Sequence, residues 1–431
     1  MNTDLQHSTT GRRAYLLRGV TLADGSHTDL AVADGLLVDA APVGADVIDA
    51  DGMIALPGLV DLHTHLREPG REDTETIATG TLAAARGGFT AVHAMPNTDP
   101  VTDTVERARY VRDVGARDGH ALVMPIGSVT VGLAGERLSD ISGMAAEMGV
   151  RVFSDDGKCV MNAQLMREAL ERVLPYGGVI AQHCQDHCLA GADACVDEGP
   201  VSAELGLPGW PAAAESAIIA RDVELAALTG SRVHACHIST AEGVEVVRWA
   251  KSRGITITAE VTPHHLLLGA ELLRGLDPIF KVNPPLRSDE DREAVRAALA
   301  DGTIDIVATD HAPHAAADKA VDLPHAKPGM LGLEQALAVV METMVLTGRM
   351  TWIDVARVMS TSPARLGQTP GQGRSLAIGE PANLVLIDPT RRAVVDREAS
   401  LSTSRNNPYH GMDLPDPVEL TMWAGRITWR R

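Results

Sequence analysis

Two histidines and an arginine stand at alternate positions where an apolar run of the sequence ends. Residues 59–62 are followed by His63, His65 and Arg67. In an extended strand, residues two positions apart point to the same face, so these three side chains are expected to converge. Imidazoles are good ligands for a divalent metal ion, and a guanidinium pairs well with a carboxylate. The pattern predicts a metal site beside an anion-binding group, although an edge strand that only carries two histidines would look the same.

Polar side chains also stand at the ends of further apolar runs. Barrels of parallel strands place their chemistry at the carboxyl ends of the strands, so these groups are expected to meet above one mouth. Four histidines and two carboxylates exceed the needs of one tetrahedral zinc ion and favour two metal ions that share a bridge. Asp310 is placed to take a proton from an activated water and pass it to a leaving nitrogen. The groups are Met95-Pro96-Asn97, Ser154-Asp155-Asp156-Gly157, Gln182-His183, His237-Ile238-Ser239, Pro263-His264-His265 and Thr309-Asp310-His311.

The elements that position these groups alternate between strand-like and helical stretches. Helices are expected at 76–86, at 289–300, at 333–346, and after a capping box formed by Ser239 and Glu242. Parallel strands need a crossover connection between them, so the alternation predicts an α/β fold, a parallel (β/α)8 TIM barrel. The eight strand-like runs are 59–62, 90–95, 121–126, 150–153, 179–181, 233–236, 255–259 and 304–308.

Short strands separated by turns are expected at both ends of the chain. We predict that residues 11–56 and 375–431 together form one small β-sandwich module beside a metal-dependent barrel of residues 57–374. This arrangement requires the two ends of the chain to meet. The first ten residues are polar and are expected to be disordered.

Composition limits the classes of function. The chain has 431 residues and a formal charge of −19, which argues against nucleic-acid or membrane binding through a basic surface. Its five cysteines show no Cys-x-x-Cys spacing, and no apolar run approaches the roughly 18 residues of a membrane span. We expect a cytoplasmic enzyme with reduced thiols that acts on a small molecule.

Some of the motifs are specific enough to indicate a family. Asp61-x-His63-x-His65 and Thr309-Asp310-His311 are widespread in one superfamily of hydrolases. Three stretches are more restricted: Leu66-Arg67-Glu68-Pro69-Gly70, Asn283-Pro284-Pro285-Leu286-Arg287 and Asp310-His311-Ala312-Pro313-His314. With these motifs the chain resembles the dihydroorotases of the amidohydrolase superfamily over essentially its whole length.

The resemblance implies a binuclear zinc centre. Many relatives bridge their two metal ions with a carbamylated lysine, whereas the resemblance to the aspartate-bridged bacterial type assigns the bridge to Asp156. Asp155 and Lys158 are close in the sequence and are the alternatives. The implied ligands are His63, His65 and Asp310 for one zinc ion and His183 and His237 for the other.

The implied reaction is the reversible cyclisation of N-carbamoyl-L-aspartate to L-dihydroorotate in pyrimidine biosynthesis. In the ring-opening direction Asp310 would protonate the departing nitrogen. Arg67, Asn97 and His314 would hold the α-carboxylate of the substrate. The backbone of residues 328–329 is expected to close over the site as a lid. All the implied substrate contacts are His65, Arg67, Asn97, Asn283, His314, Pro328 and Gly329.

Two rival interpretations stay open. A hydantoinase or allantoinase would share the barrel and the metal site, but its substrate need not carry the carboxylate that Arg67 would bind. An inactive homologue could serve as an assembly scaffold, although such proteins typically lose metal ligands. We also expect a homo-oligomer, with a possible association with aspartate transcarbamoylase. The remaining histidines, expected to pack or support the structure, are His93, His234, His264, His265 and His311.

Overall fold

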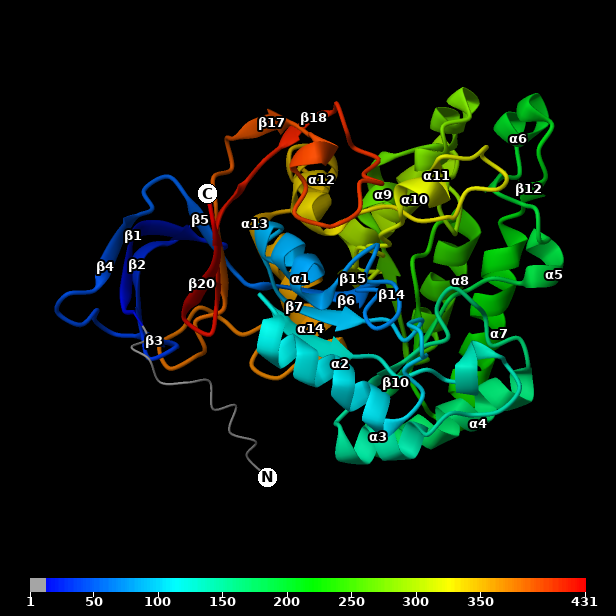
Figure 1. Ribbon diagram of the computed structural model, residues 1–431, viewed down its shortest axis with the longest axis horizontal. Helices are drawn as coiled ribbons and strands as arrows, with labels where there is room; N and C mark the ends of the chain where they lie inside the picture. Colours follow the sequence, from blue (N-terminus) through cyan, green and yellow to red (C-terminus); the bar gives the residue numbers. More distant parts are fainter. Residues whose placement is uncertain (1–12) are drawn as a thin grey trace.

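Parallel strands form the centre of the larger part of the molecule (Figure 1). The computed structural model describes residues 13–431, so the expected disorder of the first ten residues and the predicted module start at residue 11 lie outside it. Each of the eight runs expected from the sequence overlaps one strand, although several boundaries differ by one or two residues. The strands are β6 (Leu59–Thr64), β7 (Phe89–Ala94), β8 (Leu122–Pro125), β9 (Val152–Phe153), β10 (Val179–Gln182), β13 (Val233–Ala235), β14 (Ile257–Val261) and β15 (Ile306–Val307).

These strands pair in chain order around a ring. One sheet has the order β6-β7-β8 and the other the order β15-β14-β13-β10-β9, and every pair is parallel. A parallel bridge between Gly127 and Phe153 connects the β8 side to β9, and another between Thr64 and His311 connects β6 to the segment after β15. We call this ring and its helices the barrel. Because the strands are parallel, their carboxyl ends share one mouth.

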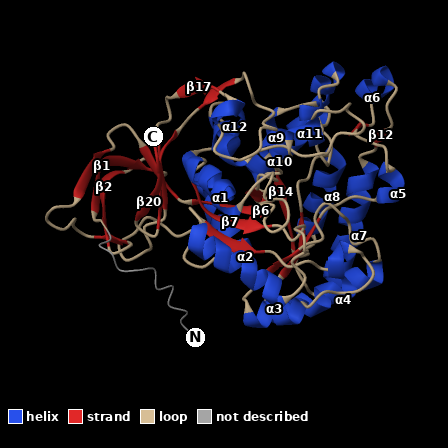
Figure 2. Ribbon diagram, in the orientation of Figure 1, coloured by secondary structure: helices blue, strands red, loops and turns tan. Residues whose placement is uncertain are grey.

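Alternate strand residues pack on opposite sides of the ring. In β10, Val179 and Ala181 belong to an apolar cluster made mainly of strand residues, whereas Ile180 belongs to the larger cluster that includes the helices. Figure 2 shows these helices around the strands. They are α1 (Ile77–Arg86), α2 (Val105–Asp118), α3 (Ile141–Glu147), α4 (Ala163–Val173), α7 (Ala213–Thr229), α8 (Ala241–Ser252) and α10 (Asp289–Asp301), and shorter ones are α5 (His187–Ala190), α6 (Pro200–Leu205), α9 (Pro263–Leu267), α11 (Ala316–Lys319), α12 (Ala336–Val340), α13 (Trp352–Ala356) and α14 (Ser362–Gly367).

Two helix predictions need correction. Helix α8 is capped by Thr240, whose hydroxyl accepts a hydrogen bond from the Gly243 backbone N–H, and not by Ser239. The Ser239 hydroxyl instead donates to Glu215 at 2.5 Å, because a buried carboxylate lies beside it. The helix expected over 333–346 is not uniform, since it passes from a 3-10 turn through α12 into a π-helical turn.

Strands from both ends of the chain form a second sheet beside the barrel. Its order is β20-β19-β16-β5-β1-β2-β3, and β4 pairs with β1. Side chains from these strands share one apolar core, so the sheet curves around it. The pairing gives a single sheet, and the two-layer sandwich stays a prediction. The strands are β1 (Tyr15–Leu22), β2 (His27–Ala33), β3 (Leu36–Val38), β4 (Asp46–Asp49), β5 (Ile54–Pro57), β16 (Leu384–Ile387), β19 (Val418–Trp423) and β20 (Arg426–Arg430).

Part of the C-terminal region lies against the barrel and not in this sheet. Two short strands, β17 (Arg392–Val394) and β18 (Asp413–Pro415), pair with each other, and the chain between them contacts the barrel mouth. A second short pair, β11 (Val196–Asp197) and β12 (Gly209–Trp210), lies between β10 and α7. Among residues 13–431, no helix has the length and apolar character needed to cross a bilayer.

Candidate functional site

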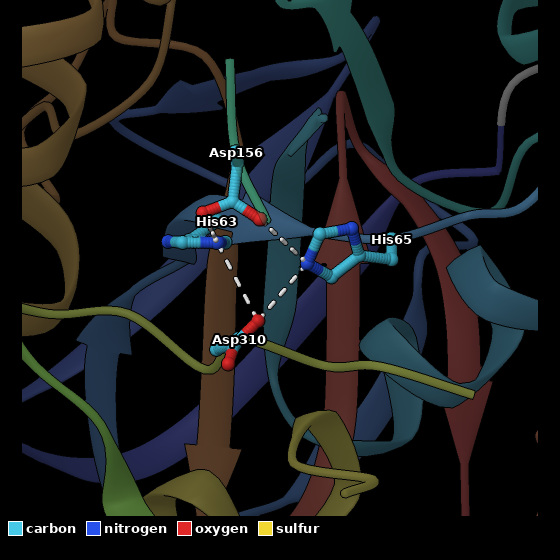
Figure 3. Close-up of side chains that lie close together, drawn as sticks. All are labelled: His63, His65, Asp156 and Asp310. Atoms are coloured by element: carbon cyan, nitrogen blue, oxygen red, sulfur yellow. Dashed lines mark hydrogen bonds and ion pairs between the residues drawn. The ribbon is translucent and has the colours of Figure 1, made fainter. Parts of the chain in front are cut away.

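Four buried side chains from three strand ends face one another at the mouth of the barrel (Figure 3). Nε2 of His63 lies 3.3 Å from Oδ1 of Asp156 and 3.4 Å from Oδ1 of Asp310. Nε2 of His65 lies 3.3 Å from Oδ2 of Asp156 and 3.0 Å from Oδ1 of Asp310. One ligand atom from each of the four residues lies within 4.8 Å of the others, so the group could hold a metal ion.

A second group shares Asp156 with the first. Nδ1 of His183 and Nε2 of His237 each lie 3.6 Å from Oδ1 of Asp156, and these two nitrogens are 2.9 Å apart. The three residues also form a group that could hold a metal ion. The structure therefore brings all six predicted ligands together, with Asp156 between the two groups.

The orientation of the histidines fits metal binding. The outer ring nitrogens donate to fixed acceptors: His63 Nδ1 to Glu260 at 2.6 Å, His65 Nδ1 to Asn97 at 2.9 Å, and His183 Nε2 to Gln185 at 2.8 Å. The inner nitrogens are left facing carboxylate oxygens, which is the arrangement typical of metal-ligating histidines. Nε2 of His63 and Oδ1 of Asp156 are buried without a hydrogen-bond partner. A cation between them would satisfy both atoms.

The electrostatics of the cluster also favour a cation. Burial alone would raise the pKa of Asp156, but the nearby imidazoles of His63, His183 and His237 lower it well below its usual range. Burial would lower the pKa of His63, but Asp156, Glu260 and Asp310 raise it well above its usual value. The buried carboxylates thus favour positive charge at this position, which a proton or a metal ion can supply.

The two alternative bridging residues lie elsewhere. Asp155 accepts hydrogen bonds from the backbone N–H groups of Val129 and Thr130 at 2.8 and 2.9 Å, and from the Thr130 hydroxyl. Its carboxylate is thereby used within the neighbouring loop. Lys158 is exposed, whereas the histidines of both groups are buried. Of the residues at this strand end, only Asp156 faces the histidines.

Three of the candidate residues have left-handed backbone conformations. The φ angles are 61° for Arg67, 34° for His237 and 46° for Asp310. Non-glycine residues in this region are strained, and such strain is concentrated at functional sites. The prediction that strand alternation directs Arg67 is wrong, because β6 ends at Thr64 and the chain leaves the strand before Arg67.

The residues predicted to hold a carboxylate lie beside the metal groups. Burial lowers the pKa of the Arg67 guanidinium to about 10, and Asp310 opposes this shift, so the group stays charged near neutral pH. Nε of Arg67 donates to the Pro313 carbonyl at 3.1 Å. Asn97 accepts from His65, as described above. Burial lowers the pKa of His314 to about 3, so this imidazole is neutral.

The remaining predicted contacts are connected to these groups. Nε2 of His314 donates to the Pro328 carbonyl at 2.8 Å. Gly329 has φ +140°, and a Cβ there would lie 2.7 Å from His314 Nε2, so a larger residue does not fit. Nδ2 of Asn283 donates to Oε1 of Gln185 at 3.2 Å, and Gln185 also holds His183. Asn283 lies in the segment after β14, and Pro328 and Gly329 lie in the segment after β15.

Two buried carboxylates carry no role in the prediction from the sequence. Glu260, inside β14, accepts from His63, from His234 Nε2 at 3.0 Å and from the His237 backbone N–H at 3.2 Å. Asp61 accepts from the backbone N–H groups of His63 and Thr309 at 3.0 and 3.1 Å, which joins the first and last strands. The signal for both was a carboxylate inside an otherwise apolar strand.

The histidines expected to be structural show different environments. Nε2 of His93 is hydrogen-bonded to the Thr369 hydroxyl at 2.8 Å, and Nδ1 of His311 accepts from the Gly332 backbone N–H at 3.2 Å. His265 is hydrogen-bonded to the Thr262 hydroxyl at 2.8 Å. His234 supports Glu260, while both ring nitrogens of the buried His264 lack a hydrogen-bond partner.

Comparison with known proteins identifies the relatives. A family model described as dihydro-orotase-like matches residues 52–243. The dihydroorotase of Streptomyces coelicolor is 56% identical over 419 residues, covering 96% of this chain and 97% of the relative. The dihydroorotase of Mycobacterium tuberculosis is 51% identical over 424 residues, covering 97% and 98%.

Solved structures share the fold. The L-hydantoinase (dihydropyrimidinase) of Arthrobacter aurescens superimposes with a TM-score of 0.84 at 25% identity, covering 96% of this chain and 95% of that one. The dihydropyrimidinase of Brevibacillus agri gives 0.83 at 22% identity, covering 97% and 95%. Because the full-length sequence identities to dihydroorotases are 51–56%, the chain belongs to the dihydroorotase family of cyclic amidohydrolases.

Proposed function

We propose that this enzyme interconverts N-carbamoyl-L-aspartate and L-dihydroorotate in pyrimidine biosynthesis. The observation that carries the proposal is the position of Arg67, whose Nε donates to the Pro313 carbonyl in the segment that begins with Asp310 of the metal groups. A charged guanidinium beside a hydrolytic cluster suits a cyclic amide that carries a carboxylate. The names of the full-length relatives agree with this substrate.

The proposed cofactor is a pair of zinc ions. His63, His65 and Asp310 would hold one ion, His183 and His237 the other, and Asp156 would contact both. Imidazole and carboxylate donors of this kind suit zinc. When bound, zinc supplies Lewis acidity that polarises an amide carbonyl and makes water more acidic.

Asp310 is the proposed proton carrier. Burial alone would raise the pKa of its carboxyl, but His63 and His65 lower it below the usual range, so the carboxylate is ionised and ready to accept a proton. In ring opening, a water oxygen bonds to the amide carbon, the carbon–nitrogen bond breaks, and Oδ of Asp310 transfers the water proton to the nitrogen. Cyclisation runs these transfers in reverse.

The proposed substrate contacts fix the ring relative to Asp310. Arg67, Asn97 and His314 would hold the α-carboxylate, and Asn283 would contact the ring amide edge through its unpartnered Oδ1 or its Nδ2. The backbone of Pro328 and Gly329 would cover the ring, and His65 would contact it from the metal side. Holding the reacting groups in place lowers the entropic cost of the reaction.

Further parts of the proposal concern organisation. The barrel of residues 57–374 would act as the (β/α)8 catalytic domain, and residues 11–56 with 375–431 as the β module. We also propose a homo-oligomer in the cytoplasm, and an association with aspartate transcarbamoylase is a possible addition. Size measurement of the purified chain, alone and mixed with that enzyme, tests both associations.

The second candidate is a hydantoinase or dihydropyrimidinase. It is favoured by the fold shared with the solved structures of those names. The deciding experiment follows the ultraviolet absorbance of L-dihydroorotate and of dihydrouracil, the same ring without the carboxylate, on protein of measured zinc content. Opening of L-dihydroorotate that is lost on chelation and restored by zinc supports the proposal. Opening of dihydrouracil alone supports the second candidate. A protein that opens neither ring and binds no metal would instead be a scaffold.

A further inference from the structure

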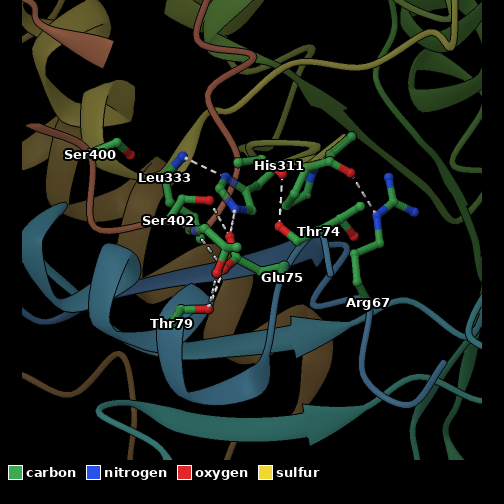
Figure 4. A network of polar contacts seen from close by, with 12 residues as sticks. Arg67, Thr74, Glu75, Thr79, His311, Leu333, Ser400 and Ser402 are labelled. Carbon is green, nitrogen blue, oxygen red and sulfur yellow. Dashed lines mark hydrogen bonds and ion pairs between the residues drawn. The ribbon is translucent and has the colours of Figure 1, made fainter. Parts of the chain in front are cut away.

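A segment near the C-terminus crosses back over the barrel mouth. We call residues 400–407 the strap (Figure 4). Its first half is tied to the turn before α1: the Ser402 hydroxyl and the Thr403 backbone N–H, the latter at 3.0 Å, both bond to the buried Glu75. The Ser404 hydroxyl donates to the Thr74 carbonyl at 2.7 Å. Glu75 also contacts Nε2 of His311 at 3.3 Å, so the strap lies beside the loop that follows β15.

The second half of the strap holds the loop after β15 through one side chain. Nδ2 of Asn406 donates to the Ala312 carbonyl at 2.8 Å and to the Gly329 carbonyl at 3.1 Å. Oδ1 of Asn406 accepts from the His314 backbone N–H at 3.1 Å. The Asn406 side chain is buried, with 3% of the residue exposed, so water does not replace these bonds readily.

These three bonds join the two ends of one loop. Ala312 and His314 stand where the loop leaves β15, and Gly329 stands where it returns. Between them the ring of His314 reaches the Pro328 carbonyl, and Gly329 lies so close to this ring that no side chain would fit at position 329. The spacing between His314 and residues 328–329 therefore depends on the planar amide of Asn406, which has two donors and one acceptor in fixed positions.

Other contacts would keep the loop folded if this amide were removed. The Ala312 backbone N–H donates to the Met330 carbonyl at 2.8 Å, and the Leu331 backbone N–H donates to the Asn406 carbonyl at 3.1 Å. Both are backbone bonds that any residue at position 406 retains. A side-chain substitution would thus leave two carbonyls and one N–H without partners, while the path of the chain is preserved.

We propose that Asn406 is a positioning residue for substrate binding, which sets the geometry of His314 and Gly329 from outside the barrel. The inference rests on the proposed function, since that function assigns the substrate contacts to His314 and Gly329. Asn406 itself touches no substrate. Its effect is expected in the affinity for the carboxylated ring and not in the metal ions or in the proton transfer by Asp310.

The test compares two adjacent asparagines. Asn407 is as buried as Asn406, with 1% exposed, but its side chain bonds to Gln335 at 2.8 Å and to the Tyr409 backbone N–H at 2.9 Å, away from the loop. Asn406→Ala should raise KM for L-dihydroorotate about tenfold, as expected for misplaced binding groups, with kcat changed less than about threefold. Asn407→Ala should lower thermal stability without this rise in KM. Zinc content should be equal in all three proteins.

Hydrogen exchange gives a readout that does not need activity. In Asn406→Ala the amide protons of His314 and of residues 329–331 should exchange faster than in wild type and in Asn407→Ala. Asn406→Ser serves as a smaller change if the alanine variant does not fold. If the wild-type protein is inactive on L-dihydroorotate, the proposed function is wrong, but the hydrogen-exchange comparison still tests whether Asn406 holds the loop. Equal exchange in the two alanine variants, or equal KM values in an active enzyme, would overturn the positioning role.

Discussion

Replacing Glu260 by glutamine should weaken metal binding while the chain stays folded. Glu260 receives hydrogen bonds from His63 at 2.6 Å, from His234 at 3.0 Å and from the His237 backbone at 3.2 Å, so it touches one proposed ligand of each metal ion. Burial alone would raise its pKa, but His63 and His234 lower it below the usual range, so the side chain is an anion. Because a carboxylate can only accept a hydrogen bond, Nδ1 of His63 carries the ring proton. The lone pair of Nε2 is then free to bind a metal ion.

Glutamine keeps the shape of the side chain and one acceptor oxygen. Its amide can face Nε2 of His234, which then accepts the bond while Nδ1 donates to the Thr258 hydroxyl at 2.9 Å. The packing is thus preserved, and the change that remains is the loss of a negative charge behind His63. Loss of such a partner typically lowers metal affinity by about tenfold to hundredfold, which corresponds to about 1.4–2.7 kcal/mol.

The assay is competition for zinc between the protein and a chromophoric chelator, with zinc per chain measured in the same samples. The control is Asp103→Asn, which neutralises another buried carboxylate: Asp103 is 4% exposed, is paired with Arg107, and contacts none of the candidate metal ligands. Thermal melting of the metal-free proteins checks that both variants fold. If zinc affinity of Glu260→Gln stays within about threefold of wild type, the reasoning about His63 is refuted.

Three other predictions follow from the site and its loop. Asp310→Asn should lower kcat by about 10²–10⁴-fold while circular dichroism stays native, and appreciable turnover would remove Asp310 from proton transfer. Arg67→Met should raise KM for L-dihydroorotate about tenfold to hundredfold with a smaller effect on kcat, and an unchanged KM would count against the carboxylate contact. Burial, together with the charge of Lys281, lowers the pKa of Lys319 to about 7. The ordinary pKa of a lysine, expected in the unfolded chain, is about 10.4, so between about pH 7 and about pH 10.4 the folded state binds fewer protons than the unfolded state. Stability should therefore rise with pH through this window, and urea unfolding of Lys319→Met at pH 7 and pH 9 should lack that rise.

The strand ends could be predicted because parallel topology turns sequence position into spatial position. Residues such as His183 and Asp310 follow apolar runs, and any ring of parallel strands must bring those ends to one mouth. The same rule cannot decide which of two adjacent loop residues faces the site. Asp155 and Asp156 are adjacent in the sequence, and their roles are separated by contacts that the sequence does not show: Val129 and Thr130 bond to Asp155, whereas Asp156 faces the histidines.

Residues that support the site from a distance gave a weaker signal. Glu260 lies within an apolar strand, where a carboxylate indicates either that the strand is wrongly assigned or that the carboxylate has a buried partner. The partner, His63, is 197 positions away in the sequence. Asn406 lies in a region that the strand pattern assigned to the β module. Periodicity describes the local chain only, so contacts between segments this far apart cannot be read from it.

The connection between fold and site is closest where the strand ring closes. His65 and Asp310 are 245 positions apart, and they meet because the Thr64–His311 bridge and the bonds to Asp61 join the first and last strands. A metal ion held by these two residues would therefore span the same junction. Since a ligand that binds only the folded state adds its binding free energy to stability, metal bound here would stabilise ring closure as well as supply the chemistry.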